Sequence, residues 1–191
     1  TCDNVGTITW ANFIRTGTDG GRGTTTTSGG TVVNYTVAVT YGANVTPATT
    51  SPTVSNGLIL FNHNATAVSG TISDNFKQFI SISFSQALRN VAFRVQDIDG
   101  NANASEPNLS REFVRVTSPS LTATPGSALT MSGGYYTSTV TGDRPVADLT
   151  HSIAYQSSGT ATATAITLEY AALVTRVQGS NPGMGISGIS F

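Results

Sequence analysis

Apolar and polar residues alternate one by one along several stretches of this chain, which is the pattern of β-strands with one buried face. The longest such stretch covers residues 31–41, and its apolar face carries Val33, Tyr35, Val37, Val39 and Tyr41. Residues 79–85, 91–96 and 164–171 repeat the alternation, with mostly Ser, Thr or charged residues on the outward face. We predict a strand at each of these four places.

Shorter apolar runs predict further strands. They lie at residues 7–10, 57–62, 113–117, 121–125, 128–131, 135–140, 149–155 and 185–191, with turn sequences such as SGG, PG, TGD and NPG between them. No helical period persists for two turns, so we predict an all-β fold, an antiparallel, jelly-roll-like β-sandwich that forms one domain over residues 1–191. The Gly- and Thr-rich residues 16–31 are expected to form a long loop or a mobile edge ribbon.

The composition suits a protein that works outside the cell. Only 10% of residues are charged, whereas Ser and Thr fill roughly a quarter of the chain, well above their share of an average domain. Hydroxyl-bearing and β-branched side chains suit the solvent-facing side of antiparallel strands. With a net charge of −1 and only short apolar runs, the chain is expected to bind no nucleic acid and to insert into no membrane.

Cys2 is the only cysteine, so the chain forms no internal disulfide. A bond to another part of a larger protein and a free surface thiol both stay open as its state. The sequence also carries no secretory leader, and we therefore expect a fragment of a larger protein, a monomeric module whose targeting signals lie elsewhere in that protein.

The segment 96–112, QDIDGNANASEPNLSRE, carries the most specific chemistry in the sequence. It connects two predicted strands, and pairing of those strands would bring Asp97 and Asp99 close to Glu112 at one end of a sheet. Asn101 continues the alternation of the two aspartates. Carboxylate and amide oxygens without His or Cys suit a hard cation, which outside the cell means Ca²⁺. We predict a Ca²⁺ site made of Asp97, Asp99, Asn101 and Glu112.

Other interpretations of this segment stay open. Asp-rich turns without a metal are common, because Asp and Asn hydrogen-bond to their own backbone. Glycosyltransferases also use an Asp-x-Asp pair, but on α/β scaffolds with nucleotide-binding loops that this sequence lacks. The segment is not an EF-hand loop, since Ala102 takes the place of the required Gly and Asn108 that of the final Glu.

No catalytic constellation stands out, and we expect the protein not to be an enzyme. Its two histidines, His63 and His151, fall beside or on predicted strands, where a buried or rim histidine is the ordinary interpretation. The tail GMGISGIS lacks the spacing of a nucleophile elbow. A glycosidase pair among Glu106, Glu112 and Glu169 is conceivable, but two of the three lie in or beside the predicted metal loop.

Aromatic residues near turns are candidates for stacking on the C–H face of a sugar. Trp10 ends a short apolar stretch, and Tyr135 and Tyr136 follow two glycines, so that one of these adjacent tyrosines must face outward. The alternative for each of them is an ordinary core or cross-strand residue. We predict a ligand site that combines aromatic rings with polar residues of the loop: Trp10, Tyr136, Asn101, Asn103 and Glu106.

Four stretches together resemble a group of extracellular bacterial domains: FSQALRNVAFRVQDIDG (84–100), EFVRVT (112–117), AITLEYA (165–171) and GMGISGISF (183–191). Such β-sandwich domains, lectin-like or otherwise ligand-binding, occur in large fibrillar, cell-wall-anchored adhesins. Their pattern has a strand that ends in D-x-D, a strand that opens with an acidic residue and a final I-G-I-S-x-I-S-F-like strand. The resemblance implies an adhesin module in which Asp97, Asp99 and Glu112 match metal ligands, with Glu112 in place of the commoner Asp.

Two functional hypotheses follow from these features. The favoured one is a Ca²⁺-containing, lectin-like module at the bacterial cell surface, which binds a host or neighbouring-cell glycan through loops on a rigid sandwich. The alternative is a structural spacer of the same kind of adhesin, with no ligand of its own. Spacers usually occur as shorter tandem copies, and this chain shows no internal repeat. A hydrolase is a third hypothesis that no motif supports.

Overall fold

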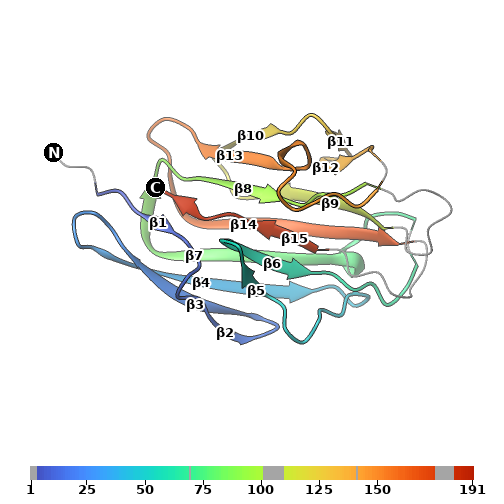
Figure 1. Ribbon diagram of the computed structural model, residues 1–191, viewed down its shortest axis with the longest axis horizontal. Helices are drawn as coiled ribbons and strands as arrows, with labels where there is room; N and C mark the ends of the chain where they lie inside the picture. Colours follow the sequence, from blue (N-terminus) through green and yellow to red (C-terminus); the bar gives the residue numbers. More distant parts are fainter. Residues whose placement is uncertain (1–3, 69, 101–109, 141, 175–182) are drawn as a thin grey trace.

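The chain folds into two antiparallel β-sheets packed face to face (Figure 1). The computed structural model describes residues 4–68, 70–100, 110–140, 142–174 and 183–191. Strand pairing is antiparallel throughout these ranges. The predicted all-β, antiparallel sandwich is confirmed.

One sheet, here called the β7–β14 sheet, contains the longest strands. Its order is β11-β12-β9-β14-β7-β4-β3-β2. The strands are Ile14–Gly17 (β2), Gly20–Thr26 (β3), Val32–Tyr41 (β4), Lys77–Arg89 (β7), Ser110–Val116 (β9), Leu129–Ser132 (β11), Tyr135–Ser138 (β12) and Thr162–Val174 (β14). The long partners β7 and β14 form the middle of the sheet.

The other sheet, here called the β8 sheet, is built around a short central strand. β8 pairs with β13 on one side and with β15 and β16 on the other, and the sheet continues to β10 beyond β13, to β6 and β5 beyond β15, and to β1 beyond β16. The strands are Thr7–Ile8 (β1), Thr53–Ser55 (β5), Leu58–Asn62 (β6), Ala92–Gln96 (β8), Leu121–Pro125 (β10), Ile153–Ser157 (β13), Gly183–Ile186 (β15) and Ile189–Ser190 (β16).

The chain passes from one sheet to the other again and again after β4, which gives the jelly-roll-like topology. β7, β9 and β14 belong to one sheet, whereas β8, β10, β13 and β15 belong to the other. Consecutive strands therefore often face each other across the core instead of pairing. The strands at residues 91–96 and 113–117, whose pairing would bring Glu112 to the aspartates, therefore do not pair, since β8 and β9 lie in different sheets.

The alternation read from the sequence builds the core. β4 is alternately exposed and buried along its length, and its buried residues are the predicted Val33, Tyr35, Val37 and Val39. β7 and β14 bury Ile80, Ile82, Ile166 and Leu168 against the inward residues of the β8 sheet in one cluster. Burial of these two apolar faces against each other is the main stabilising term of a sandwich.

The expectation of a long loop at residues 16–31 is wrong, and its edge-ribbon alternative is the closer description. Residues 14–26 form the hairpin of β2 and β3, and β3 pairs with β4 along its full length. The glycines suit this strand because an aromatic ring covers it: a Cβ atom on Gly23 would collide with the buried ring of Tyr35. That ring is held edge-on against Trp10, with 5.3 Å between centroids.

Helical structure in the described ranges is limited to two single 3₁₀ turns, Asp74–Phe76 (η1) and Leu149–His151 (η2). This agrees with the expectation that no helix exceeds about two turns. No helix in this part of the chain has the length and apolar character needed to cross a bilayer.

Candidate metal centre

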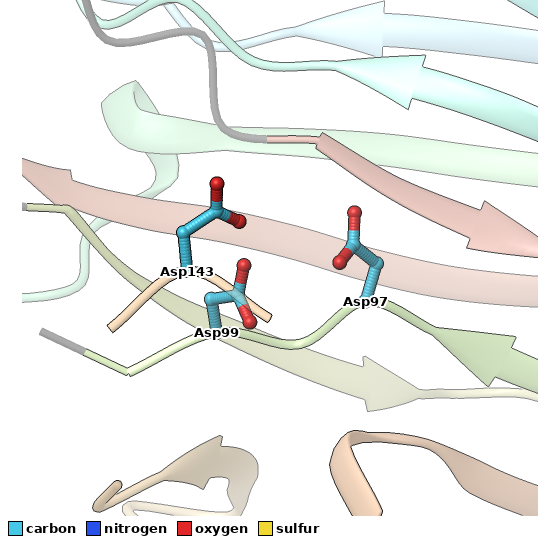
Figure 2. A group of neighbouring side chains, drawn as sticks. All are labelled: Asp97, Asp99 and Asp143. Carbon is cyan, nitrogen blue, oxygen red and sulfur yellow. The ribbon is translucent and has the colours of Figure 1, made fainter. Parts of the chain in front are cut away.

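Three carboxyl groups converge where β8 ends. Asp97 and Asp99 follow β8 directly, and Asp143 comes from the connection between β12 and β13. One carboxylate oxygen from each residue lies within 4.8 Å of the others, so the group could hold a metal ion. Figure 2 shows the three carboxyl groups rising to the same side of the segments that carry them.

The backbone around Asp97 and Asp99 is tightly fixed. Asp97 has a left-handed φ of 68°, a conformation that Asp adopts more readily than most residues. The buried Ile98 then donates its N–H to the carbonyl oxygen of His151 at 3.0 Å. Nδ1 of His151 lies 3.0 Å from the carbonyl oxygen of Ile98 and 3.8 Å from Oδ1 of Asp99. These contacts hold both aspartates in place at the strand end.

A close approach of two backbone segments brings Asp143 to this site. Gly100 lies so near the carbonyl oxygens of Ser138 and Val140 that a Cβ atom would overlap them. A glycine is therefore required where the two connections pass each other. Beyond this point the N–H of Arg144 donates to Oδ1 of Asp99 at 3.2 Å, which places the neighbouring Asp143 beside it.

Glu112 is buried next to the aspartates and holds the backbone of Asp99 by hydrogen bonds. Its Oε2 accepts a 2.6 Å hydrogen bond from the N–H of Asp99, and its own N–H donates to the carbonyl oxygen of Asp99 at 3.1 Å. Its Oε1 accepts a hydrogen bond from the hydroxyl of Tyr170. Both residues are buried. Glu112 thus links β9 and β14 of one sheet to the end of β8 in the other.

Burial and mutual repulsion raise the pKa of Asp97, Asp99 and Glu112. Burial, with the charge of Asp143, raises the pKa of Asp97 to about 6. Burial, with the neighbouring Asp97 and Asp143, raises the pKa of Asp99 to about 8. Burial holds the pKa of Glu112 well above its usual range, although the hydrogen bonds from Tyr170 and Asp99 act in the opposite direction. Within the described ranges, neither Lys nor Arg forms an ion pair with any of the four.

Asp97 has a second distinctive environment. Its Oδ1 is buried, and no hydrogen-bond donor meets it in the described part of the chain. The residue also lines a pocket of about 210 Å³ together with the apolar Leu60 and Met184 and the polar Ser51 and Asn62. A buried carboxylate oxygen without a donor is costly, and a bound cation would supply the missing partner.

The structure brings together some of the predicted metal ligands and not others. Asp97 and Asp99 lie side by side as expected, and Glu112 lies close to both but uses its two oxygens for hydrogen bonds. The third member of the carboxylate group is Asp143. The TGD sequence at residues 141–143 predicts only a turn, and no sequence signal marks Asp143 as a ligand. Asn101 lies outside the described residues.

The predicted ligand-binding residues do not form an exposed aromatic platform. Trp10 is 1% exposed and donates its ring N–H to the carbonyl oxygen of Ser187 at 3.0 Å, so its prediction as a sugar contact is wrong. Tyr136 is half-buried and packs against the main core. Tyr135 takes the outer face, as the alternation of adjacent tyrosines requires, but Arg115 covers its ring with 4.5 Å from Cζ to the centroid. Asn103 and Glu106 lie outside the described residues, as does Cys2.

Both histidines are core residues, which agrees with their ordinary interpretation. His63 is fully buried, its Nε2 lies 2.8 Å from the carbonyl oxygen of Phe76, and burial lowers its pKa from 6.5. His151 is 2% exposed and supports the strand end described above.

Comparisons with models of protein families, with curated proteins and with solved structures found no match.

We expect Tyr170→Phe to lower the free energy of unfolding by about 1–3 kcal/mol, because it leaves a buried oxygen of Glu112 without its donor. Urea denaturation at pH 7 in the presence of a chelator measures this loss independently of any cation. Tyr41→Phe is the matched control, since the hydroxyl of the half-buried Tyr41 donates to the carbonyl oxygen of Thr18 at 2.6 Å, and its loss should cost about 1 kcal/mol or less. Equal losses in the two variants would contradict a special role for the Tyr170–Glu112 link.

Proposed function

We propose that this chain is a ligand-binding module of a bacterial surface adhesin, in which Asp97, Asp99 and Asp143 hold Ca²⁺ and a glycan binds beside the ion. The observation that carries the proposal is that Asp97 belongs to two neighbouring features at once. Its side chain belongs to the carboxylate group and also to the wall of the neighbouring pocket. A ligand in that pocket therefore lies next to the ion.

The donor set favours Ca²⁺ over the other common metals. All three candidate side chains offer carboxylate oxygens, which suit hard cations, and the nearby His151 already uses Nδ1 at the carbonyl oxygen of Ile98. Ca²⁺ takes six to eight oxygen ligands in a flexible geometry. Three carboxylates leave several positions for water and for vicinal hydroxyl groups of a sugar.

The pocket beside the ion has the mixed character of a small-ligand site. Leu60, Phe61 and Met184 supply apolar wall, while Ser51 and Asn62 supply hydroxyl and amide groups. It is small enough that one sugar unit would fill most of it. We expect micromolar to millimolar affinity, because a shallow site buries little apolar area.

The adhesin assignment draws its support from the sequence. A Ser- and Thr-rich chain with few charges suits an extracellular surface, and the four stretches quoted above resemble modules of fibrillar adhesins. Many copies of a weak binding module on one cell would raise avidity without any new contact.

Ca²⁺ should raise the melting temperature strongly at pH 8 and only weakly at pH 5.5. The raised pKa values of Asp97 and Asp99 mean that the folded state keeps protons that the unfolded chain, with Asp near 3.8, has released. Without Ca²⁺, stability therefore falls as pH rises from the unfolded pKa of 3.8 to the folded values of about 6 for Asp97 and about 8 for Asp99, and at pH 5.5 the ion must displace those protons. At pH 8 and a hundredfold excess over its dissociation constant, Ca²⁺ should add about 2.7 kcal/mol. Differential scanning fluorimetry with Ca²⁺ or chelator measures both shifts.

Asp143→Asn is the informative variant here, since Asp143 is exposed and its replacement leaves the core intact. It should lose most of the Ca²⁺-dependent shift. Asp19→Asn, at an exposed aspartate in the turn between β2 and β3, should respond like the wild type. A Ca²⁺ shift that survives unchanged in Asp143→Asn places the ion elsewhere.

A glycan array probed with the chain in Ca²⁺ and again in chelator tests the binding function. We expect a restricted set of glycans that is lost on chelation and lost in Asp99→Asn, because the ion both shapes the site and contacts the sugar. Retention of the Ca²⁺-dependent melting shift with no glycan bound at any concentration tested would instead favour the structural spacer.

A further inference from the structure

A second hollow lies on the outer face of the β8 sheet, around Arg94. Its volume is about 360 Å³, and its lining comes from β8, β10, β13 and the connection between β15 and β16. The lining residues used below are Ala92, Arg94, Thr124, Ala154 and Gln156. None of the residues that line it also lines the pocket beside Asp97.

Small residues in register create this hollow. Arg94 pairs with Ala154 across β8 and β13, and Ala154 pairs with Thr124 across β13 and β10. Two pairs further along the same strands, and so on the same face, Ala92 lies opposite Gln156. The two alanines form a low apolar floor, and the longer side chains of Arg94 and Gln156 rise on either side of it.

Among the described residues, Arg94 is the only charged one that lines the hollow, and it forms no ion pair there. The residue is half-buried, and Nη1 donates to Oγ of Ser152 at 3.3 Å. No carboxylate of the described chain lies within ion-pair distance of its guanidinium group. The other guanidinium donors are left without a protein partner in the same part of the chain.

We propose that this hollow binds a carboxylate-bearing sugar, such as a uronic acid residue. A guanidinium group matches a carboxylate through two parallel hydrogen bonds, which is a more specific contact than a point charge provides. Thr124 and Gln156 are exposed, and their side chains form no hydrogen bond within the described ranges, so these side chains are available to ring hydroxyl groups. The floor of Ala92 and Ala154 offers apolar surface to the C–H face of the ring.

The volume and the charge distribution favour this ligand class over others. A hollow of this size falls within the usual range for small-molecule sites. A single guanidinium balances a single carboxylate, whereas nucleic acid and anionic membranes require an extended basic surface. The site does not depend on the proposed Ca²⁺ centre, because it shares no residue with it.

The test is an NMR titration of the ¹⁵N-labelled chain with glucuronate, in chelator, with glucose and acetate as matched ligands. We expect saturable shifts at the amides of Ala92, Arg94, Ala154 and Gln156 for glucuronate only. Arg94→Gln should weaken glucuronate binding by about tenfold or more, since it removes the charge-assisted pair. Arg22→Gln, at an exposed arginine of β3 in the other sheet, makes the same charge change and should have no effect.

Gln156→Ala serves as a second variant, because an exposed side chain can be shortened without unfolding the chain, and it should weaken binding by a smaller factor. The proposal is overturned if acetate binds as tightly as glucuronate, or if Arg94→Gln and Arg22→Gln weaken binding equally. It is also overturned if the shifts lie away from the hollow or require Ca²⁺. If these shifts appear while the glycan array returns nothing, only the Asp97 pocket is excluded. If the array succeeds and these shifts are absent, only the Arg94 site is excluded, so the two proposals are separable.

Discussion

Repulsion among the carboxyl groups of Asp97, Asp99, Asp143 and Glu112 is the interaction on which the proposed site depends. Each charge that forms makes the next one less favourable, and partial burial weakens the screening that water would provide. In the described part of the chain, the one basic side chain within 4 Å of these carboxylate oxygens is His151, 3.8 Å from Asp99. Such an arrangement is relieved either by protons, as the raised pKa values show, or by a cation. A divalent ion relieves it without requiring acid conditions.

The topology explains why these groups meet at all. Asp97 and Asp99 leave the β8 sheet, Glu112 and Tyr170 belong to the β7–β14 sheet, and Asp143 lies on a connection between the two. The hydrogen bonds through Glu112 therefore tie the sheets together at one end of the sandwich. An ion bound to the three aspartates would also link the connection that carries Asp143 to this end of the two sheets. Cation binding would therefore make this end of the sandwich more rigid.

Sequence patterns predicted the fold well because alternation reports directly on which face of a strand is buried. Val33, Tyr35, Val37 and Val39 are buried as predicted, since only that arrangement removes their apolar surface from water. Alternation did not predict the Gly- and Thr-rich strand β3. Its inward positions are glycines that make room for the rings of other residues.

The candidate site was predictable only in part. Asp97 and Asp99 are close in sequence, so their proximity follows from local geometry. Asp143 joins them through a close backbone approach at Gly100, a long-range contact that no local pattern encodes. Glu112 lies near the aspartates as expected, but strand pairing is not the cause, because β8 and β9 face each other across the core and do not pair. The burial of Trp10 likewise depends on tertiary packing against Tyr35.

The central claim is that one cation is shared by Asp97, Asp99 and Asp143. A crystal structure grown with Ca²⁺, with anomalous data collected at long wavelength, tests it most directly. The account predicts one anomalous peak about 2.3–2.6 Å from an oxygen of each of the three aspartates. It also predicts that Glu112 keeps its hydrogen bonds with Asp99 and Tyr170. Crystals in which saturating Ca²⁺ leaves no peak there, or in which Asp143 lies away from the bound ion, would contradict it.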